Sequence, residues 1–392
     1  MPWRQTDPVL ERTRFVLEAE RSGIALSELC RRYGISRPTG YQWIRRYQAE
    51  GLAGLEDHSR RPHRFPNETP AEVVDQLVKL RARKPNWGPK KLLARLQRLH
   101  PELPLPAAST VSAILKRKGL VEPARRRPKP ERVLVSNTGE PEAANEVWTT
   151  DFKGEFRVGS GELCYPLTIS DGWSRFLLAC DGLASTRYEL TRPTFIRVFQ
   201  EFGLPDRIRS DNGPPFGTHA ICGLSRLAVW WLKLGIRVER SRPGKPQDNG
   251  RHERMHRTLK EETTRPAEPQ MSAQQERFDA FRREYNEERP HEALGGLSPA
   301  DLYRPSWRPL TSETPGLDYP AHYERRQVRR DGSIKWRGRH VFISEILERE
   351  PVGLEEIEDD VWAVYFASLQ LGTLTHGKFN PKKRAKPGGG TS

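Results

Sequence analysis

Three acidic residues of this sequence are candidate ligands of a metal ion. Asp151 closes a β-type run, Asp211 follows a second short run, and Glu253 comes early in a charged helical segment. Two carboxylates at the ends of adjacent strands repel each other unless a cation lies between them, so the pair indicates a divalent-metal site. A glutamate on a helix above the same edge can supply a third ligand.

The elements that must position these acids follow one another in the order βββαβαβα. Strands are predicted within 146–156, as a hairpin over 163–183, and at 207–211 and 236–242; helices are predicted at 191–203, 225–235 and within 244–262. This order predicts an α/β sandwich with polar residues at one edge of the sheet. A right-handed crossover makes the first and fourth strands neighbours, which brings Asp151 to Asp211.

The segment GKPQDNGRHERMHRTLKEE, residues 244–262, carries the third acid on a helix predicted to begin near Asn249. Glu253, His256, Arg257 and Lys260 then fall at i, i+3, i+4 and i+7 and share one face. We expect Glu253 to turn toward the metal while Arg257 and Lys260 act as cations that can hold the phosphates of a polyanionic ligand. The alternative is a solvated Glu253 that only pairs with Arg257.

Neighbouring polar and aromatic residues receive structural interpretations. Asp171 and Asp181 flank the hairpin strands and are expected to make turns, and Asp206 is expected in a loop between a helix and a strand. Trp230 and Trp231 lie in an apolar run and are expected to be at least partly buried.

Composition and charge favour several modest domains that bind nucleic acid. The 392 residues are 35% hydrophobic with 33 Pro and 31 Gly, which indicates small domains joined by polar linkers. Residues 1–132 hold 28 basic and 14 acidic residues, so they carry +14 of the net charge of +15. Such a basic end binds polyanions by releasing counterions from phosphates.

Residues 25–51 show the pattern of a helix-turn-helix. Ile35 is predicted to face inward after a turn at Gly34, Tyr41 and Ile44 to lie on the second helix, and Ser36 can cap that helix. The outward residues near that cap are the candidates for DNA contacts: Arg37, Thr39, Gln42, Arg45 and Arg46. An ordinary helical hairpin is the alternative.

The rest of the chain divides by composition into helical, mixed and β-type parts. The predicted division is a helix-turn-helix domain 1–55, a linker 56–70, a second helix-turn-helix domain 71–122, a basic linker 123–140, an α/β core 141–305, a linker 306–322, a small β-barrel 323–376 and a disordered tail 377–392. The barrel is expected either to bind DNA or to mediate multimer contacts.

Cysteine usage indicates neither a disulfide framework nor a zinc site. The four cysteines lie far apart without a C-x-x-C pair, and no cysteine pair follows His58 and His63. No stretch approaches the roughly 18 apolar residues of a membrane span, and no signal peptide is apparent. We therefore expect a cytoplasmic protein whose cysteines are small core residues.

Four motifs behind the helix-turn-helix region, WTTDFKG, SDNGPPF, DNGRHERMHRTLKEE and YNEERPHEALGGLSP, resemble those of bacterial insertion-sequence transposases with a retroviral-integrase-type (DDE) catalytic core. The resemblance covers nearly the whole chain. It implies an RNase H-like fold for 141–305 and identifies Asp151, Asp211 and Glu253 as the acidic triad. Because 41 residues separate Asp211 from Glu253, more than is common in the family, Asp248 remains the alternative third acid.

The resemblance also implies an activity and its partners. Such an enzyme binds the double-stranded ends of its element, cleaves them and joins the 3′-hydroxyl to target DNA, using two Mg²⁺ or Mn²⁺ ions roughly 3.5 to 4 Å apart. One active site acts at each DNA end, which implies a homo-oligomer. Two alternatives are a DNA-binding regulator with a decayed core, and a nuclease that only cuts.

Overall fold

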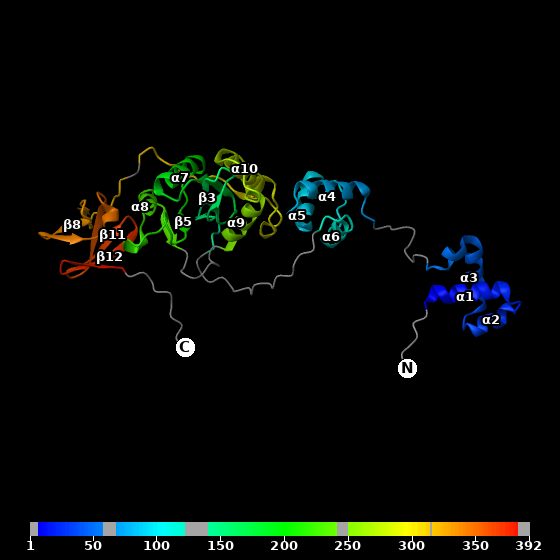
Figure 1. The fold of residues 1–392 in the computed structure, drawn as a ribbon. Helices are drawn as coiled ribbons and strands as arrows, with labels where there is room; N and C mark the ends of the chain where they lie inside the picture. Colours follow the sequence, from blue (N-terminus) through cyan, green and yellow to red (C-terminus); the bar gives the residue numbers. More distant parts are fainter. Residues whose placement is uncertain (1–6, 58–67, 122–139, 241–249, 314–315, 383–392) are drawn as a thin grey trace. The chain divides into compact units, whose positions relative to one another are not determined.

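The computed structural model describes residues 7–57, 68–121, 140–240, 250–313 and 316–382, which form two compact units, 1–68 and 69–392 (Figure 1). His58, His63 and Asp248 lie outside the described residues, as does nearly all of the basic linker 123–140. Among the helices that are described, none has the length and apolar content needed to cross a membrane.

The first unit is a three-helix module. Its elements are α1 (Pro8–Arg21), α2 (Leu26–Arg32), α3 (Arg37–Glu50) and the 3-10 helix η1 (Gly51–Leu55). Gly34 adopts a positive φ of 64° in the turn between α2 and α3, and the Ser36 hydroxyl accepts a hydrogen bond from the Thr39 amide at the start of α3. The predicted helix-turn-helix is thus present, with α1 packed against it.

Tyr41 lies on the outer side of α3 and is 54% exposed. The packing of α3 against the rest of the module runs instead through Gly40, where a Cβ would come within 2.6 Å of the Cys30 sulfur. Trp43, Ile44 and Tyr47 complete this buried side. A close helix contact at a glycine therefore sets which face of α3 is inside.

The second unit begins with three helices, α4 (Ala71–Arg83), α5 (Pro89–Leu99) and α6 (Ala108–Arg117), packed around the buried Trp87. These match the helical segments predicted for 71–122. Cations of this module contact acidic residues of the segment 284–301: Lys84 lies 2.6 Å from Glu284, and Arg98 binds both carboxylate oxygens of Asp301 at 2.8 Å.

A mixed sheet follows. Its strands are β1 (Val147–Phe152), β2 (Phe156–Arg157), β3 (Leu163–Asp171), β4 (Leu177–Leu183), β5 (Arg207–Ser210) and β6 (Arg237–Arg240). β1 pairs antiparallel with β3 and parallel with β5, which confirms the predicted adjacency of the first and fourth long strands. The two-residue strand β2 was not predicted.

Helices cover both faces of this sheet. One face packs Trp148 against α7 (Tyr188–Phe202) and α8 (Arg226–Lys233), and Trp230 and Trp231 are buried there as expected. The other face packs Cys164 and Cys180 against α9 (Gly250–Thr263) and α10 (Met271–Arg283). The result is a three-layer α/β/α core.

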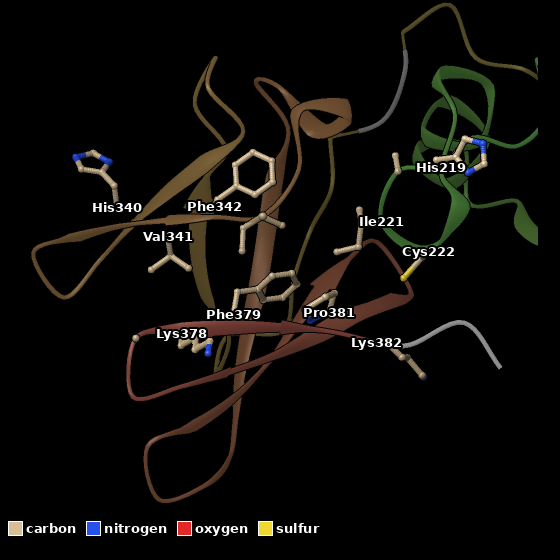
Figure 2. A pocket seen from close by; sticks show the side chains of 13 residues that line it. His219, Ile221, Cys222, His340, Val341, Phe342, Lys378, Phe379, Pro381 and Lys382 are labelled. Carbon is tan, nitrogen blue, oxygen red and sulfur yellow. The ribbon is translucent and has the colours of Figure 1, made fainter. Parts of the chain in front are cut away.

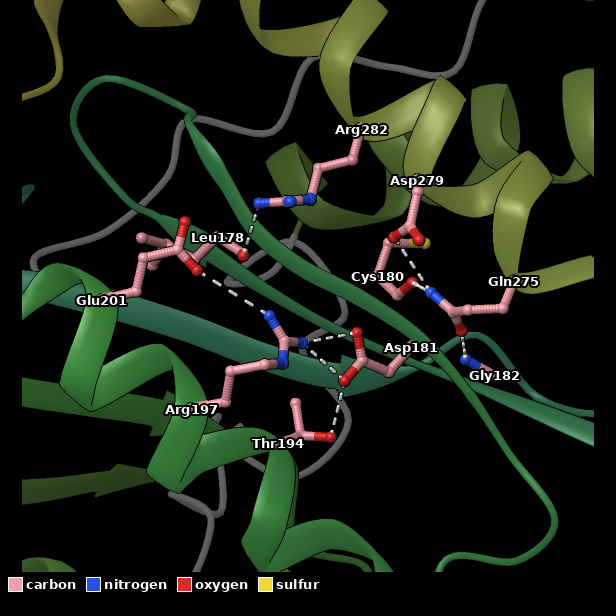
Figure 3. A network of polar contacts seen from close by, with 10 residues as sticks. All are labelled: Leu178, Cys180, Asp181, Gly182, Thr194, Arg197, Glu201, Gln275, Asp279 and Arg282. Atoms are coloured by element: carbon pink, nitrogen blue, oxygen red, sulfur yellow. Dashed lines mark hydrogen bonds and ion pairs between the residues drawn. The ribbon is translucent and has the colours of Figure 1, made fainter. Parts of the chain in front are cut away.

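Asp171 makes the expected turn, but Asp181 does not. The Asp171 carboxylate accepts hydrogen bonds from the Ser174 amide and hydroxyl at 2.7 and 2.6 Å in the turn between β3 and β4. Asp181 instead lies within β4 and joins this strand to α7, because Arg197 and Thr194 donate to it (Figure 3). Both acids are thus structural, and Asp206 lies in the loop before β5 as predicted.

The C-terminal region forms two antiparallel sheets. Its strands are β7 (Glu324–Gln327), β8 (Ser333–Trp336), β9 (Arg339–Phe342), β10 (Pro351–Glu358), β11 (Val361–Phe366), β12 (Leu369–Thr375) and β13 (Lys378–Pro381). The order β13-β12-β11-β10-β7 with a separate β8-β9 hairpin is an open path, so the pairings do not show a closed barrel. β13 corrects the predicted start of the tail, since Phe379 packs against the apolar cluster of this region.

The predicted linker 306–322 is packed against the core over its first residues. The amide of Ser306 donates to the carbonyl of Phe202 at the end of α7, and the Arg308 guanidinium donates to the carbonyl of Leu234 just after α8. Helix ends leave carbonyl groups without partners inside the helix, and this segment satisfies them. Packing therefore fixes a segment that composition alone identified as a spacer.

Helix α8 lies between the mixed sheet and the C-terminal sheets. Trp231 faces the mixed sheet, whereas Val229 and Leu232 join the apolar cluster of the C-terminal strands. The half-buried Cys222 approaches the carbonyls of Gln370 and Leu371 at 3.8 Å. All four cysteines are free, as predicted, and the other three are buried.

We predict that Leu232→Ala lowers the free energy of unfolding by about 2–5 kcal/mol, because it leaves a cavity where α8 meets the C-terminal strands. Leu190→Ala on the exposed side of α7 is the matched control and should change it by less than about 0.5 kcal/mol. Urea unfolding followed by tryptophan fluorescence measures both; equal effects would show that α8 is not a shared core element.

Candidate active site

Strand register places Asp151 beside Asp211. Thr150 is in register with Ser210 on the parallel strands β1 and β5, and the next residue of each chain segment is an aspartate. Burial raises the pKa of Asp151 to about 7, and the negative charges of Asp211 and, more weakly, Glu253 contribute to the rise. The structure thus places Asp211 and Glu253 within electrostatic reach of Asp151.

The turn after β5 holds Asp211 in place. Burial raises the pKa of this carboxyl, and the Gly213 amide and the positive charge of Arg240 oppose the rise. A Cβ at Gly213 would lie 2.9 Å from Oδ2 of Asp211, so a larger residue there would displace this carboxylate. Arg240 on β6 donates to the Ser210 hydroxyl at 2.9 Å and to the Asp211 carbonyl at 3.1 Å.

The carboxylates fit a divalent cation. Oδ1 of Asp211 is buried and finds no hydrogen-bond donor in the described part of the chain. A buried, unsatisfied carboxylate oxygen beside a second carboxylate is costly unless a cation neutralises both. Carboxylate oxygens are the donors that Mg²⁺ and Mn²⁺ prefer.

Helix α9 presents two different faces. Glu253, Arg257 and Lys260 are exposed, whereas His252 and His256 are buried. The predicted face is therefore wrong for His256, which points into the protein and does not accompany the two cations. Met255 and Leu259 are buried beside the histidines, and this apolar spacing decides which side of α9 rests on the sheet.

A polar layer lies between α9 and the sheet. Nε2 of His252 and Nε2 of His256 each lie 2.7 Å from the Thr168 hydroxyl, and Nδ1 of His256 lies 3.8 Å from Oδ2 of Asp151. Burial lowers the pKa of His252 to about 3 and lowers that of His256 further, so both imidazoles are neutral at pH 7. Together with Asp151, the two histidines form a group that can hold a metal ion.

Sequence analysis missed this histidine pair. The signal was present in the spacing, because His252, Met255, His256 and Leu259 fall at i, i+3, i+4 and i+7. A face of two histidines, a methionine and a leucine is less polar than the face of Glu253, Arg257 and Lys260. That contrast indicates which side is buried.

The candidate DNA-contact residues of α3 separate into two groups. Arg37, Gln42 and Arg45 are exposed. Thr39 takes part in the helix cap, and Arg46 donates to the Glu56 carbonyl and stacks on Trp43 at 4.6 Å from the ring centroid. The first group is available for DNA, while the second has contacts within its own module.

A groove of about 1340 Å³ lies elsewhere, between the loop at 219–222 and the C-terminal strands (Figure 2). Basic and apolar side chains line it, among them His219, His340, Phe342, Lys378 and Lys382. It has no carboxylate in its lining and therefore does not present the ligands of a divalent-metal site.

Family models match four stretches of the chain. Two models described as integrase core domain match residues 141–246 and 234–299. A model described as helix-turn-helix domain matches 11–63, and one described as homeodomain-like domain matches 39–115. Integrase-type cores use divalent metal ions, in agreement with the carboxylate set.

Relatives occur among insertion elements and retroviruses. The chain is 26% identical over 292 residues to the insertion element IS407 uncharacterized 31.7 kDa protein of Burkholderia multivorans, covering 72% of this chain and 92% of that protein. It is 33% identical over 114 residues to the Gag-Pol polyprotein of baboon endogenous virus, a match that spans 29% of this chain and 6% of the polyprotein. Among solved structures, the HTLV-2 integrase catalytic core domain in complex with magnesium is 14% identical, with 41% of this chain and 97% of that chain covered and a TM-score of 0.33.

We predict that Asp151→Asn raises the Tm of the metal-free protein at pH 8. Because the pKa of this acid is about 7 in the folded protein, against 3.8 for an ordinary aspartate, wild-type stability falls as the pH rises from about 4 through 7. The Tm advantage of the variant should therefore be smaller at pH 5 than at pH 8. Thermal unfolding in EDTA measures it, and a difference independent of pH would contradict the raised pKa.

Proposed function

Because this chain is an enzyme of the transposase and integrase kind, with an integrase core domain behind helix-turn-helix domains, we propose that it mobilises an insertion sequence. In this proposal it binds the ends of its element, cleaves phosphodiester bonds there and joins the freed 3′-hydroxyl to target DNA. The convergence of Asp151, Asp211 and Glu253 supports the proposal most directly, since the charges of the last two raise the pKa of the first.

The three acids would act as metal ligands. Asp151, Asp211 and Glu253 would hold two Mg²⁺ or Mn²⁺ ions, which when bound activate the attacking water or hydroxyl and stabilise the leaving oxygen of an in-line displacement. The Gly213 amide binds the Asp211 carboxylate, and Arg240 holds the Asp211 backbone carbonyl. Arg257 and Lys260, exposed on the same helix as Glu253, reach the phosphates that flank the scissile bond.

Recognition of the element ends is assigned to α3. Arg37 and Gln42 lie exposed in its first half, the part of such a helix that contacts base edges in the major groove. Arg45 lies further along α3 and suits a phosphate. Thr39 and Arg46 contribute through the cap and through the contacts that fix α3, with any direct DNA contact secondary.

The chemistry implies a homo-oligomer on DNA, because one active site is needed at each of the two ends. Two alternatives share part of this description: a regulator would only bind DNA, and a nuclease would only cut it. Labelled element ends incubated with a plasmid target and Mg²⁺ distinguish them, since the outcomes are binding alone, cleavage alone, or cleavage with joining. The first two outcomes would refute the proposed function.

We predict that Asp151→Asn, Asp211→Asn and Glu253→Gln each abolish cleavage and joining while affinity for element ends stays nearly unchanged, because metal binding and end recognition use different domains. The matched control is Glu261→Gln, an exposed glutamate two turns along α9, which should keep wild-type activity. Cleavage assays and gel-shift titrations give both quantities. An active Glu253→Gln protein would transfer the third role to Asp248.

We predict that Gln42→Ala and Arg45→Ala change DNA binding in different ways. Loss of a base contact at Gln42 should relax preference at one base pair by about 1–3 kcal/mol. Loss of a phosphate contact at Arg45 should weaken binding to all sequences and reduce the salt slope by about 1. Gln48→Ala, at the far end of α3, is the control; identical behaviour of the first two variants would refute the assignment.

A further inference from the structure

The polar layer under α9 lies where a helix usually packs on a sheet through apolar side chains. Thr149 and Asp151 on β1 share a face with their register partners Ser170 and Thr168 on β3. His252 packs on this patch from α9, and its Nδ1 lies 3.1 Å from the hydroxyls of both Thr149 and Ser170. Buried polar groups are retained only when each finds a partner, so the layer can be accounted for atom by atom.

The Thr168 hydroxyl indicates which nitrogen of each imidazole ring carries the proton. It donates to the backbone carbonyl of Asp151 at 3.1 Å, and a hydroxyl has only one proton to give. With this proton on the Asp151 carbonyl, N–H groups of His252 and His256 make the two contacts with the Thr168 oxygen, both 2.7 Å. Each neutral ring therefore carries its proton on Nε2 and a lone pair on Nδ1.

The two Nδ1 lone pairs differ in their surroundings. That of His252 lies 3.1 Å from the Ser170 hydroxyl, which can donate to it, while the Thr149 hydroxyl donates to the Ser170 carbonyl. That of His256 makes no hydrogen bond within the described chain, and it faces Oδ2 of Asp151 across 3.8 Å. Two electron-pair donors that face each other repel, unless a cation lies between them.

We propose that Nδ1 of His256 is a further ligand of the metal ion held by Asp151, an inference that rests on the metal site of the proposed function. Metal–nitrogen and metal–oxygen bonds are roughly 2.0–2.2 Å long, so one ion can reach two donors that are 3.8 Å apart. Asp151 and His256 then hold the ion from the sheet and from α9, respectively.

The proposal gives His252 a positioning role. It shares Thr168 with His256, and its own Nδ1 is fixed by Thr149 and Ser170, so it keeps α9 in register on the sheet. Glu253 follows His252 directly in the sequence. The histidine pair would therefore also set where Glu253 stands relative to Asp151. An imidazole ligand shifts preference from Mg²⁺ toward softer ions such as Mn²⁺.

Pulsed electron paramagnetic resonance of Mn²⁺ bound to the full-length protein tests the inference without an activity assay. We expect a nitrogen coupling that changes to the ¹⁵N pattern when histidine is labelled with ¹⁵N. His256→Gln keeps an amide that can reach Thr168 but lacks the Nδ1 donor, so it should lose the coupling. It should also bind Mn²⁺ roughly 10- to 100-fold more weakly, because mutation of a residue that only hydrogen-bonds to a metal ligand already lowers metal affinity by that factor. His252→Gln is the matched control and should keep the coupling.

The outcomes separate this inference from the proposed function. Absence of nitrogen coupling in the wild type, or its persistence in His256→Gln, would overturn the ligand role; the former is the result expected if Thr168 donates to His256 and an Nδ1–H faces Asp151. Asp151→Asn should abolish tight Mn²⁺ binding, and if it does not, the metal site itself is wrong. Suppose that His256→Gln fails to fold by circular dichroism. Histidine-dependent coupling in the wild type that survives in His252→Gln then still assigns the ligand, because these two are the histidines that group with Asp151 among the described residues.

Discussion

The repulsion between two half-buried carboxylates at the ends of neighbouring parallel strands is the constraint on which the catalytic half of this protein depends. The register of β1 with β5 makes Asp151 and Asp211 neighbours, and burial raises the pKa of each. The surrounding residues fix the position of these carboxylates but do not neutralise their negative charge. Gly213 and Arg240 fix Asp211, and Oδ1 of that residue still has no donor in the described structure. Two close carboxylates whose charge is not neutralised by the protein favour the binding of a cation between them.

Helix α8 transmits this order to the C-terminal region. A helix that is apolar on all sides must be covered on all sides, and α8 has the mixed sheet on one side and the C-terminal strands on the other. The loop before α8 also contacts the C-terminal strands, through Cys222. The same long connection between Asp211 and Glu253 thus serves two purposes. It spaces two acids along the chain, and it provides the surface on which the last sheets pack.

The sequence was sufficient for the elements whose signals are local. The strand and helix order, the adjacency of Asp151 and Asp211, and the burial of Trp230 and Trp231 follow from apolar periodicity and connection rules. The features that were not predicted from the sequence depend on long-range packing. Asp181 binds α7 and makes no turn, residues 306–322 satisfy carbonyls at distant helix ends, and β13 exists because Phe379 meets the C-terminal cluster. Composition assigned these segments to turns, linkers and tails, because it carries no information on the distant residues that they contact.

The helix with Glu253 shows the same limit at the site itself. Counting from Glu253 selects positions that share its face, but the count has no means of rejecting His256, because i+3 and i+4 neighbours both fit. The rejection comes from Met255 and Leu259, which define a separate buried side. A periodicity argument that begins at a functional residue is therefore weaker than one that begins at the apolar residues.

Net charge is also a poor guide to where DNA lies. The excess of cations in residues 1–132 suggests a continuous binding surface, yet several of those cations are already engaged. Lys84 and Arg98 pair with Glu284 and Asp301, so these cations of the α4–α6 module face acids of the same unit. Lys116 and Arg117 at the end of α6 are exposed, as are Arg37 and Arg45 on α3. Added salt screens both kinds of pair, so a salt-dependent loss of DNA binding would combine weaker phosphate contacts with looser packing of the α4–α6 module. The two contributions differ in origin, because phosphate contacts release counterions from DNA whereas Arg98 and Asp301 exchange one protein contact for water.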